Sequence, residues 1–413
     1  MKTTNVRVAI DIGTTKVCTV IASSDAGGLH IIGVGSQSSQ GLKKGSVVNI
    51  EKTVQAIRAS IDEAKLMAGV DVLSEATIGI AGNHIYCFNS SGVVPVKGKE
   101  ITQADVDRVI EAAKAVLIPS DREVLHVIPQ EFKVDNTSGI KDPVGMFGSR
   151  LEVYVHIVTG KSPLVQNLIK CVEHAGVNAS QVVLQPLASS RSVLTPEEKE
   201  LGVAIIDIGG GTTDLAIWKD GALVHSQIIP IGGNHFTNDL AVALKIPHTE
   251  AERIKVQNGN VLSEAIDANS HVSVQGLTGT RPKEVPLRAV AEVLGARAEE
   301  LITVVRDIIA EKHLTSLVTG GYVVTGGGAL VAGFSELAEY LLEKPCKIGY
   351  PRPIGGIGNV MQDPKFATVL GLLLDAADQP LQETSARSAQ ERESSDFVAR
   401  IGSSFKNVFK DLF

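Results

Sequence analysis

The sequence predicts an α/β fold with two similar domains, and three glycine-containing stretches support this prediction. Residues 203–218 (VAIIDIGGGTTDLAIW) place an aspartate, three glycines and two threonines between apolar runs that are typical of buried strands. Residues 6–21 (VRVAIDIGTTKVCTVI) repeat the pattern near the N-terminus, and residues 320–333 (GGYVVTGGGALVAG) place three more glycines after an apolar run. Two copies of one hairpin pattern indicate two similar domains that face each other across a shared ligand.

The two repeated turns are suited to binding phosphate. Glycine lets backbone N–H groups approach an anion closely, and an aspartate at the end of the incoming strand is a suitable partner for Mg²⁺. The pattern differs from a P-loop, because no G-x-x-x-x-G-K-[ST] occurs and a strand follows each turn. One copy would equally fit an ordinary glycine hairpin, whereas two copies favour a nucleotide site. In the third stretch, backbone without side chains is flat enough to stack against adenine.

Composition limits the class of protein. The chain has 413 residues, of which 44% are hydrophobic and 21% charged, and this balance is typical of two to three globular domains. The net charge of −7 gives no support for nucleic-acid binding, so we expect none. The four cysteines are scattered, which predicts reduced thiols in a cytosolic protein and no metal site. The chain enters a strand directly and its most apolar window, residues 366–374, is short, so we expect no signal peptide and no membrane span.

Periodicity divides the chain into six parts. The order of the predicted elements is strand–strand–strand–helix–strand at the start, then a change of character, then a return to α/β. The predicted parts are a first domain core (1A; residues 1–85 and 161–197), an inserted α+β subdomain (1C; 86–160), a second domain core (2A; 198–246 and 310–376), a small subdomain (2B; 247–309), a flexible linker (377–395) and an amphipathic helix (396–413).

The helix predicted at residues 287–309 is long and amphipathic. It either packs on its own domain with a solvated face or offers a groove to a partner, and the pattern alone leaves both interpretations open.

The last stretch, SSDFVARIGSSFKNVFKDLF, predicts a second amphipathic helix behind a loose linker. At about 100° per residue its apolar residues fall within an arc of roughly 160°. These residues are Phe397, Val398, Ile401, Phe405, Val408, Phe409, Leu412 and Phe413. Lysines and an arginine on the other face suit an anionic lipid surface. The alternative is a helix docked on the core of the same protein. Four of the ten phenylalanines lie here, behind a linker that is poor in large apolar residues, and this favours the membrane surface.

Together these stretches resemble the actin/sugar-kinase/heat-shock-ATPase superfamily, and within it the FtsA family of bacterial cell-division proteins. The resemblance spans essentially the whole chain. Asp11–Lys16 matches the phosphate-1 motif, Asp207–Asp214 the phosphate-2 motif and Thr325–Gly328 the adenosine motif. Residues 190–218 and 251–259 are particularly similar to this family. The resemblance implies an actin-like fold of duplicated ribonuclease-H-like domains, with the inserted subdomain and the C-terminal helix as the features peculiar to the family.

The resemblance also implies a site for ATP and Mg²⁺. Asp11 and Asp207 would hold Mg²⁺, mostly through water. The phosphate contacts implied on one side are Gly13, Thr14, Thr15 and Lys16, and on the other Gly209, Gly210, Gly211, Thr212 and Thr213. Gly232 and Gly233 would complete this cradle, Glu252 and Lys255 would lie beside the ribose, and Gly326, Gly327 and Gly328 beside the adenine. The nearest candidate to position water is Gln185. Since glutamine is a poor general base, we expect ATP binding with slow or negligible turnover.

The function implied is an ATP-binding filament protein of the divisome. It would tether the FtsZ ring to the cytoplasmic face of the inner membrane at the division site, as a peripheral protein, and recruit later division proteins. In this family the small subdomain receives the C-terminal tail of FtsZ, and Arg288, Arg297 and Arg306 are the basic candidates here. The inserted subdomain would contact the next subunit. The alternatives are a sugar- or acetate-type kinase, which would need a substrate pocket with a base, and a protein similar to pilus-assembly ATPases.

Overall fold

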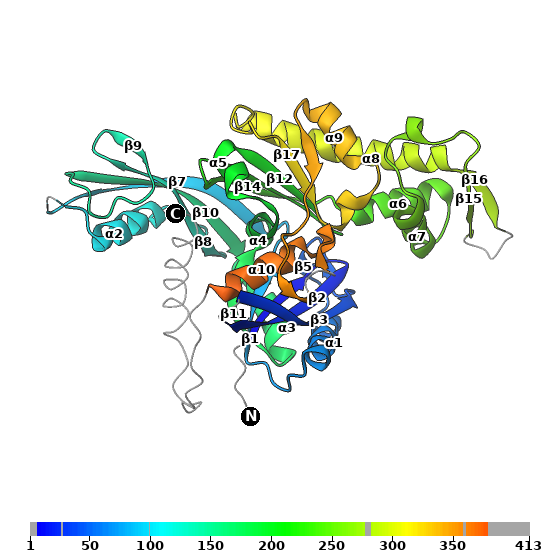
Figure 1. Ribbon diagram of the computed structural model, residues 1–413, viewed down its shortest axis with the longest axis horizontal. Helices are drawn as coiled ribbons and strands as arrows, with labels where there is room; N and C mark the ends of the chain where they lie inside the picture. Colours follow the sequence, from blue (N-terminus) through cyan, green and yellow to red (C-terminus); the bar gives the residue numbers. More distant parts are fainter. Residues whose placement is uncertain (1–5, 26–27, 99, 277–281, 358–360, 379–413) are drawn as a thin grey trace.

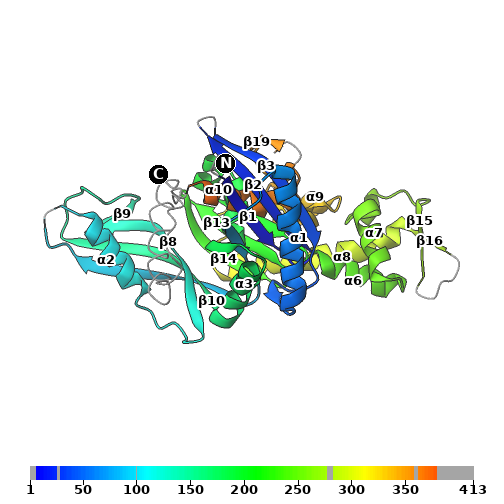
Figure 2. The same ribbon diagram turned by 90° about the horizontal axis from the view of Figure 1, so that it is seen from below.

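The computed structural model describes residues 6–25, 28–98, 100–276, 282–357 and 361–378. The molecule is elongated, with two β-sheets and their helices in the middle (Figure 1). A smaller sheet lies at one end, and a group of helices with a two-stranded ribbon lies at the other. A view turned by 90° shows the same arrangement (Figure 2).

The first sheet has six strands in the order β11-β6-β1-β2-β3-β19. The central strand β1 pairs antiparallel with β2 and parallel with β6, and both of its faces are covered, which explains its continuous apolar run. Helices α1 and α3 pack on one face, and α4 and α10 on the other. The strands are β1 (Val6–Ile12), β2 (Lys16–Asp25), β3 (Gly28–Ser38), β6 (Glu75–Ile80), β11 (Asn178–Leu184) and β19 (Gly355–Gly356). The helices are α1 (Ile50–Ala68), α3 (Ser162–His174), α4 (Gln185–Val193) and α10 (Ala367–Ala377), and a short ribbon of β4 (Leu42–Lys43) and β5 (Ser46–Val47) follows β3.

The second sheet repeats the strand order of the first. Its five strands run β14-β13-β12-β17-β18, and β12 is antiparallel to β13 and parallel to β17. The corresponding part of the first sheet runs β3-β2-β1-β6-β11, so the predicted duplication of an α/β domain is confirmed. The strands are β12 (Val203–Ile208), β13 (Thr213–Lys219), β14 (Ala222–Ile229), β17 (Tyr322–Thr325) and β18 (Cys346–Ile348). Around it lie α5 (Pro196–Leu201), α6 (Gly233–Leu244), η2 (Gly327–Leu330) and α9 (Phe334–Leu342).

Between β6 and α3 the chain forms a separate α+β unit. Its sheet has the order β7-β10-β8-β9, and α2 packs on the sheet through the buried residues of a core of its own. The elements are β7 (Ile85–Pro95), α2 (Gln103–Lys114), β8 (Arg122–Val134), β9 (Thr137–Ile140) and β10 (Arg150–Lys161). We call this unit the inserted sheet.

At the other end, the small helical region precedes β17. It contains α7 (His248–Asn258), η1 (Ser263–Ala265), β15 (His271–Val274), β16 (Lys283–Pro286) and α8 (Leu287–Glu311). The apolar face of α8 is buried in the second domain's core through Val290, Leu294, Leu301 and Val305. Burial of this face supports packing of the helix on its own domain.

The sequence-based division of the chain placed residues 310–376 wholly in the second domain. The structure places the last described residues of this range differently. In the structure β19 pairs with β3, and α10 packs against β1, β2 and β6 of the first sheet. The chain therefore returns to the first domain after β18, because the apolar side chains of α10 fill the second face of the first sheet. The short helix η4 (Pro364–Phe366) lies between β19 and α10.

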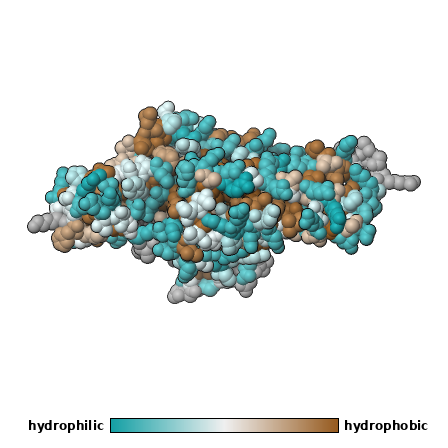
Figure 3. Space-filling view, turned by 90° about the horizontal axis from the view of Figure 1, so that it is seen from above, coloured by the Kyte–Doolittle hydropathy of each residue, from teal (hydrophilic) through white to brown (hydrophobic). Residues whose placement is uncertain are grey.

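Hydrophilic side chains cover most of the face in Figure 3, and hydrophobic ones form scattered groups. Within the part of the chain that the structure describes, no helix is both long and apolar enough to cross a membrane.

Candidate functional site

The two glycine turns face each other tip to tip. The first closes with a hydrogen bond from Gly13 N–H to the Lys16 carbonyl, and the second with one from Gly209 N–H to the Thr212 carbonyl, both at 2.9 Å. A Cβ atom on Gly210 would lie 2.3 Å from Cγ2 of Thr15. A Cβ on Gly211 would lie 2.5 Å from the hydroxyl of Thr14. Only glycine fits here, so the second turn offers backbone where the first offers side chains.

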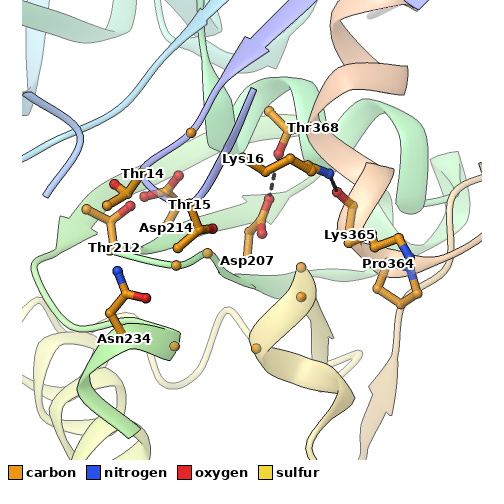
Figure 4. Close-up of a pocket in the computed structure, with 18 of the residues that line it drawn as sticks. Thr14, Thr15, Lys16, Asp207, Thr212, Asp214, Asn234, Pro364, Lys365 and Thr368 are labelled. Carbon is orange, nitrogen blue, oxygen red and sulfur yellow. Dashed lines mark hydrogen bonds between the residues drawn. The ribbon is translucent and has the colours of Figure 1, made fainter. Parts of the chain in front are cut away.

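A cavity of about 510 Å³ opens beside this contact (Figure 4). Most of the residues predicted from sequence line it, although they come from six separate stretches of the chain. These residues are Asp11, Gly13, Thr14, Thr15, Lys16, Gln185, Asp207, Gly209, Gly210, Gly211, Thr212, Gly233, Glu252, Lys255, Gly326, Gly327 and Gly328. The structure therefore brings the hairpins, the start of α6, α7 and the third glycine stretch to one site.

Two predicted residues are not among those that line the cavity. The Thr213 hydroxyl donates to the Ile231 carbonyl at 2.8 Å. Gly232 lies against the second hairpin, where a Cβ would meet the Gly209 carbonyl at 2.7 Å. The next amide, that of Gly233, donates to the same carbonyl at 2.8 Å. Thr213 and Gly232 thus support the second hairpin from behind.

Three buried carboxylates lie at the base of the hairpins. Asp207 and Asp214 are cross-strand partners on β12 and β13, and Asp11 ends the apolar run of β1. Burial raises the pKa of Asp11 to about 6; Lys16 lowers it in part and Asp207 raises it. Burial also raises the pKa of Asp207, and it raises that of Asp214 well above its usual value, with Asp207 and Asp11 adding repulsion.

This concentration of negative charge fits a divalent cation. The Gln185 side chain donates to Asp11 at 2.9 Å and the Thr368 hydroxyl donates to Asp207 at 3.1 Å, whereas Oδ1 of Asp214 has no hydrogen-bond partner. Among the described residues, no three His, Cys, Asp or Glu side chains are grouped closely enough to hold a metal ion directly. The set therefore fits an ion such as Mg²⁺ that keeps most of its water ligands.

The two predicted lysines are both engaged. Lys16 Nζ donates to the Lys365 carbonyl at 2.6 Å and lies 4.5 Å from the centre of the Phe366 ring. Lys255 Nζ lies 2.7 Å from the Glu252 carboxylate and donates to Thr237 and the Gly233 carbonyl at the start of α6. Glu252 and Lys255 thus form one ion pair at the edge of the cavity.

The structure adds lining residues that sequence reasoning missed. Pro364, Lys365 and Thr368 come from η4 and the start of α10, and Asn234 comes from α6 (Figure 4). Asp363, directly before η4, and Gly45, from the turn between β4 and β5, also line the cavity. The amide of Gly45 donates to Thr14 at 3.2 Å. Asp214 was part of the phosphate-2 motif but not a predicted site residue. A threonine in an apolar helix and a glycine in a short turn have no local signal of a site.

The three arginines predicted to bind a partner have different surroundings. Successive arginines of this set are nine residues apart, and nine steps of about 100° end half a turn away from the start. Arg288 and Arg306 therefore lie on one side of α8 and Arg297 on the opposite side. Arg297 donates to both carboxylate oxygens of Asp239 on α6, at 2.6 and 3.0 Å. It therefore joins two helices of the same domain, whereas Arg288 and Arg306 are exposed. The predicted linker, apart from its first two residues, and all the predicted membrane residues (Phe397 to Phe413) lie outside the described residues.

Comparison with known proteins decides the family. A model described as cell division protein FtsA matches residues 204–371, and one described as the SHS2 domain inserted in FtsA matches residues 82–159. Cell division protein FtsA of Pseudomonas aeruginosa is 44% identical over 368 residues, which are 89% of this chain and 88% of that protein. The chain belongs to the FtsA family. The FtsA of Neisseria meningitidis is 40% identical over 97% of this chain and 98% of its own length, and that of Escherichia coli is 38% identical over 89% of each.

Solved structures share the actin-like fold of this FtsA-family protein at low identity. The PilM–PilN type IV pilus biogenesis complex gives a TM-score of 0.67 at 16% identity, covering 91% of this chain and 99% of the other. MreB 5 of Spiroplasma citri, bound to AMPPNP, gives a TM-score of 0.54 at 16% identity, covering 91% and 96%. The resemblance to the FtsA family is therefore confirmed, and with it the actin-like fold and a role in cell division.

Proposed function

We propose that this protein binds ATP with Mg²⁺ between its two glycine hairpins, assembles on the membrane and tethers the FtsZ ring there. The observation that supports the nucleotide site best is the tip-to-tip contact of the hairpins beside the cavity, with buried carboxylates at its base. The AMPPNP-bound MreB 5 has the same fold and gives a precedent for a nucleotide in it.

Each part of the site has a proposed task. Thr14, Thr15 and the amides of residues 209–212 bind phosphate from opposite sides, since hydroxyl and N–H donors suit phosphate oxygens. Glu252 and Lys255 lie beside the ribose, and Gly326 to Gly328 lie beside the adenine. Asp11 and Asp207 face the ion through water. A bound Mg²⁺ would supply charge neutralisation for the phosphates.

Turnover is proposed to be slow. Gln185 is the residue placed to orient water, and its side chain already donates to Asp11. An amide has no basic atom strong enough to remove a proton from water, so this site favours binding over hydrolysis.

The decisive test is calorimetry of Mg·ATP binding to Asp207→Ala. We expect the substitution to abolish Mg·ATP binding, because it removes a carboxylate at the base of both hairpins. Asp62→Ala, an exposed aspartate on α1, is the control and should bind as the unsubstituted protein does. Unchanged affinity of Asp207→Ala would remove the basis for this site.

Membrane attachment is proposed for the C-terminal helix predicted at residues 396–413, behind a linker at 377–395. One short helix binds an anionic surface weakly, whereas a filament presents many copies and binds firmly through effective concentration. This couples assembly to attachment at the cytoplasmic face of the inner membrane, where the protein would be peripheral.

Vesicle flotation tests the anchor. Phe405→Asp with Phe409→Asp should release the protein from anionic vesicles without changing ATP binding, because both apolar anchors become charged. Ser403→Asp with Asn407→Asp adds the same charge on the polar face and should weaken flotation less. Flotation of the phenylalanine variant equal to that of the unsubstituted protein would place the anchor elsewhere.

Three partners remain proposals. The small subdomain 247–309 would receive the C-terminal tail of FtsZ, with Arg288 and Arg306 as its exposed cations. The inserted subdomain 86–160 would contact the next subunit and later division proteins.

We also propose bounds for the two domain cores. The first core comprises residues 1–85, 161–197 and 355–377, and the second comprises 198–246 and 310–354.

A further inference from the structure

Strand β8 passes through three hydrophobic cores. Near its start Leu125 packs on the core of the first domain. Ile128 lies in a second cluster with Trp218 and Leu223 of the second domain, and Phe132 lies in the core of the inserted sheet. One strand therefore contacts all three parts of the molecule, and Figure 2 shows the inserted sheet beside β14.

At its first-domain end, β8 is bonded to the backbone next to the candidate site through one residue. Nε2 of His126 accepts a hydrogen bond from the Leu184 amide at 3.0 Å, and burial lowers the pKa of this histidine to about 4. The ring is therefore neutral, with its proton on Nδ1. Leu184 precedes Gln185, the first residue of α4, whose side chain donates to Asp11 in the cavity. His126 is thus fixed to the backbone directly before a cavity residue.

At the second-domain end, the inserted sheet caps an edge strand. Among the described strands, none of this sheet lies beside the outer edge of β14. Gln130 on β8 donates to the carbonyls of Leu223 and Val224 at 2.8 and 3.1 Å. Asn89 on β7 donates to the Val224 carbonyl at 3.2 Å. Side-chain amides take the place of a neighbouring strand here and protect an exposed edge.

A buried histidine completes this attachment. His156 on β10 is fully buried, and burial lowers its pKa to about 3. Nδ1 lies 2.6 Å from Oδ1 of Asn89, and Nε2 lies 2.8 Å from the Ser226 hydroxyl on β14. Since the Asn89 amide nitrogen already donates to Val224, its oxygen accepts from Nδ1–H and the serine hydroxyl donates to Nε2. Each of the three side chains in this relay has a hydrogen-bond partner, and the relay joins β7 and β10 of the inserted sheet to β14.

The contact between the hairpins explains why this attachment matters. Thr15 lies against Gly210 at the tips of the turns, so a nucleotide whose phosphate enters between them, and not only the cavity beside them, would move one sheet relative to the other. Since β8 is bonded to both domains, this movement must either break one attachment or turn the inserted sheet.

We propose that β8 couples nucleotide binding to the orientation of the inserted sheet, with His126 attached to the start of α4 and Gln130 to β14. This inference rests on the proposed nucleotide site. The residues involved are positioning residues, since none of them lines the cavity. The consequence is that the face the inserted sheet offers to a neighbour depends on the nucleotide state.

Energy transfer between two dyes tests the coupling in the full-length chain. The dyes are attached through unnatural amino acids at exposed positions, 66 on α1 and 138 on β9. Mg·ATP should change the transfer efficiency with the same midpoint that calorimetry gives for binding. Gln130→Glu keeps the size of the side chain but replaces its amide donor with carboxylate oxygens, which cannot donate to the Leu223 and Val224 carbonyls. The attachment to β14 is then broken, so Mg·ATP should no longer change the transfer efficiency. His126→Leu, which breaks the other attachment, should lose it as well.

Nucleotide affinity gives an independent readout. If binding must work against the attachment, linkage requires that Gln130→Glu lower the Kd for Mg·ATP, by about fivefold for a coupling near 1 kcal/mol. Gln55→Glu at an exposed position of α1, where the side chain bonds only within its own helix, is the matched control and should leave both readouts unchanged. If Gln130→Glu lowers the melting temperature strongly, Gln130→Ala replaces it.

The outcomes separate the two proposals. If calorimetry detects no heat of binding, the proposed nucleotide site is overturned, and the coupling with it. Binding without a change in transfer, or a change that persists in both Gln130→Glu and His126→Leu, overturns the coupling alone.

Discussion

The two halves of this FtsA-family protein share a strand order but differ in what their hairpins contribute. After Gly13 the first hairpin has Thr14 and Thr15, and after Gly209 the second has Gly210 and Gly211 at the corresponding place. Side chains from one half fill the space that the glycines of the other leave open. A duplicated scaffold therefore forms one site because the two copies became complementary rather than identical.

The halves also differ in where extra structure was added. The first carries the inserted sheet after its fourth strand, β6, and the second carries the small helical region before its fourth strand, β17. Figure 1 places these additions at opposite ends of the molecule. Both are connected at element ends, so neither interrupts a central strand, and each is free to serve a different partner.

The largest expected difference concerns the carboxylates below the hairpins. The pKa of Asp11 is raised from 3.8 to about 6, so between these values the folded protein holds a proton that the unfolded chain has lost. The free energy of unfolding of the nucleotide-free protein should therefore fall as pH rises through this window, by about 3 kcal/mol for this group. Denaturant unfolding of Asp11→Asn, measured with a chelator present, should show a fall that is smaller by this amount.

Asp214 extends the pH prediction from the first hairpin to the second. Its pKa is raised well above its usual value, so its contribution to the free energy of unfolding should also fall as pH rises above that value, and Asp214→Asn should remove this contribution. Equal slopes for both variants and the unsubstituted protein would contradict the assignment.

The second prediction tests the complementarity of the turns. Gly210→Val should weaken Mg·ATP binding by about 10- to 100-fold, because overpacking costs about 1–3 kcal/mol. Thr15→Gly in the same chain should recover part of the loss, since it removes the atoms that the new side chain meets. Calorimetry measures both, and Gly98→Val, where the nearest atom to a Cβ is 3.7 Å away, is the control. Additive effects of the two substitutions would show that the turns do not meet.

The smallest effect is expected for substitutions in the small helical region of the second domain. Arg288→Glu with Arg306→Glu should slow association with an acidic FtsZ tail peptide, measured by fluorescence anisotropy, and leave stability unchanged. Arg297→Glu should instead lower the free energy of unfolding by about 1–2 kcal/mol, since it breaks the pair with Asp239. Loss of peptide binding only in Arg297→Glu would reverse these roles.

The sequence by itself determined the duplicated α/β architecture and most of the lining of the cavity. Glycine turns, apolar strands and the aspartates that end them are local patterns, and each hairpin closes with a bond between residues three apart. Their repetition was visible without any knowledge of distant contacts. The amphipathic helix at residues 287–309 was predicted for the same reason, because the periodicity of one helix is a property of consecutive residues.

Only the tertiary structure decided which distant residues meet at the site and where the chain ends its second domain. Lys16 was predicted to contact phosphate, yet its ammonium group donates to the carbonyl of Lys365, 349 positions away. Thr368 reaches Asp207, and α10 packs on the first sheet, because that sheet has a second apolar face that no nearby segment covers. Such contacts depend on how packed layers bring unrelated segments together, and short-range sequence patterns have no information on that.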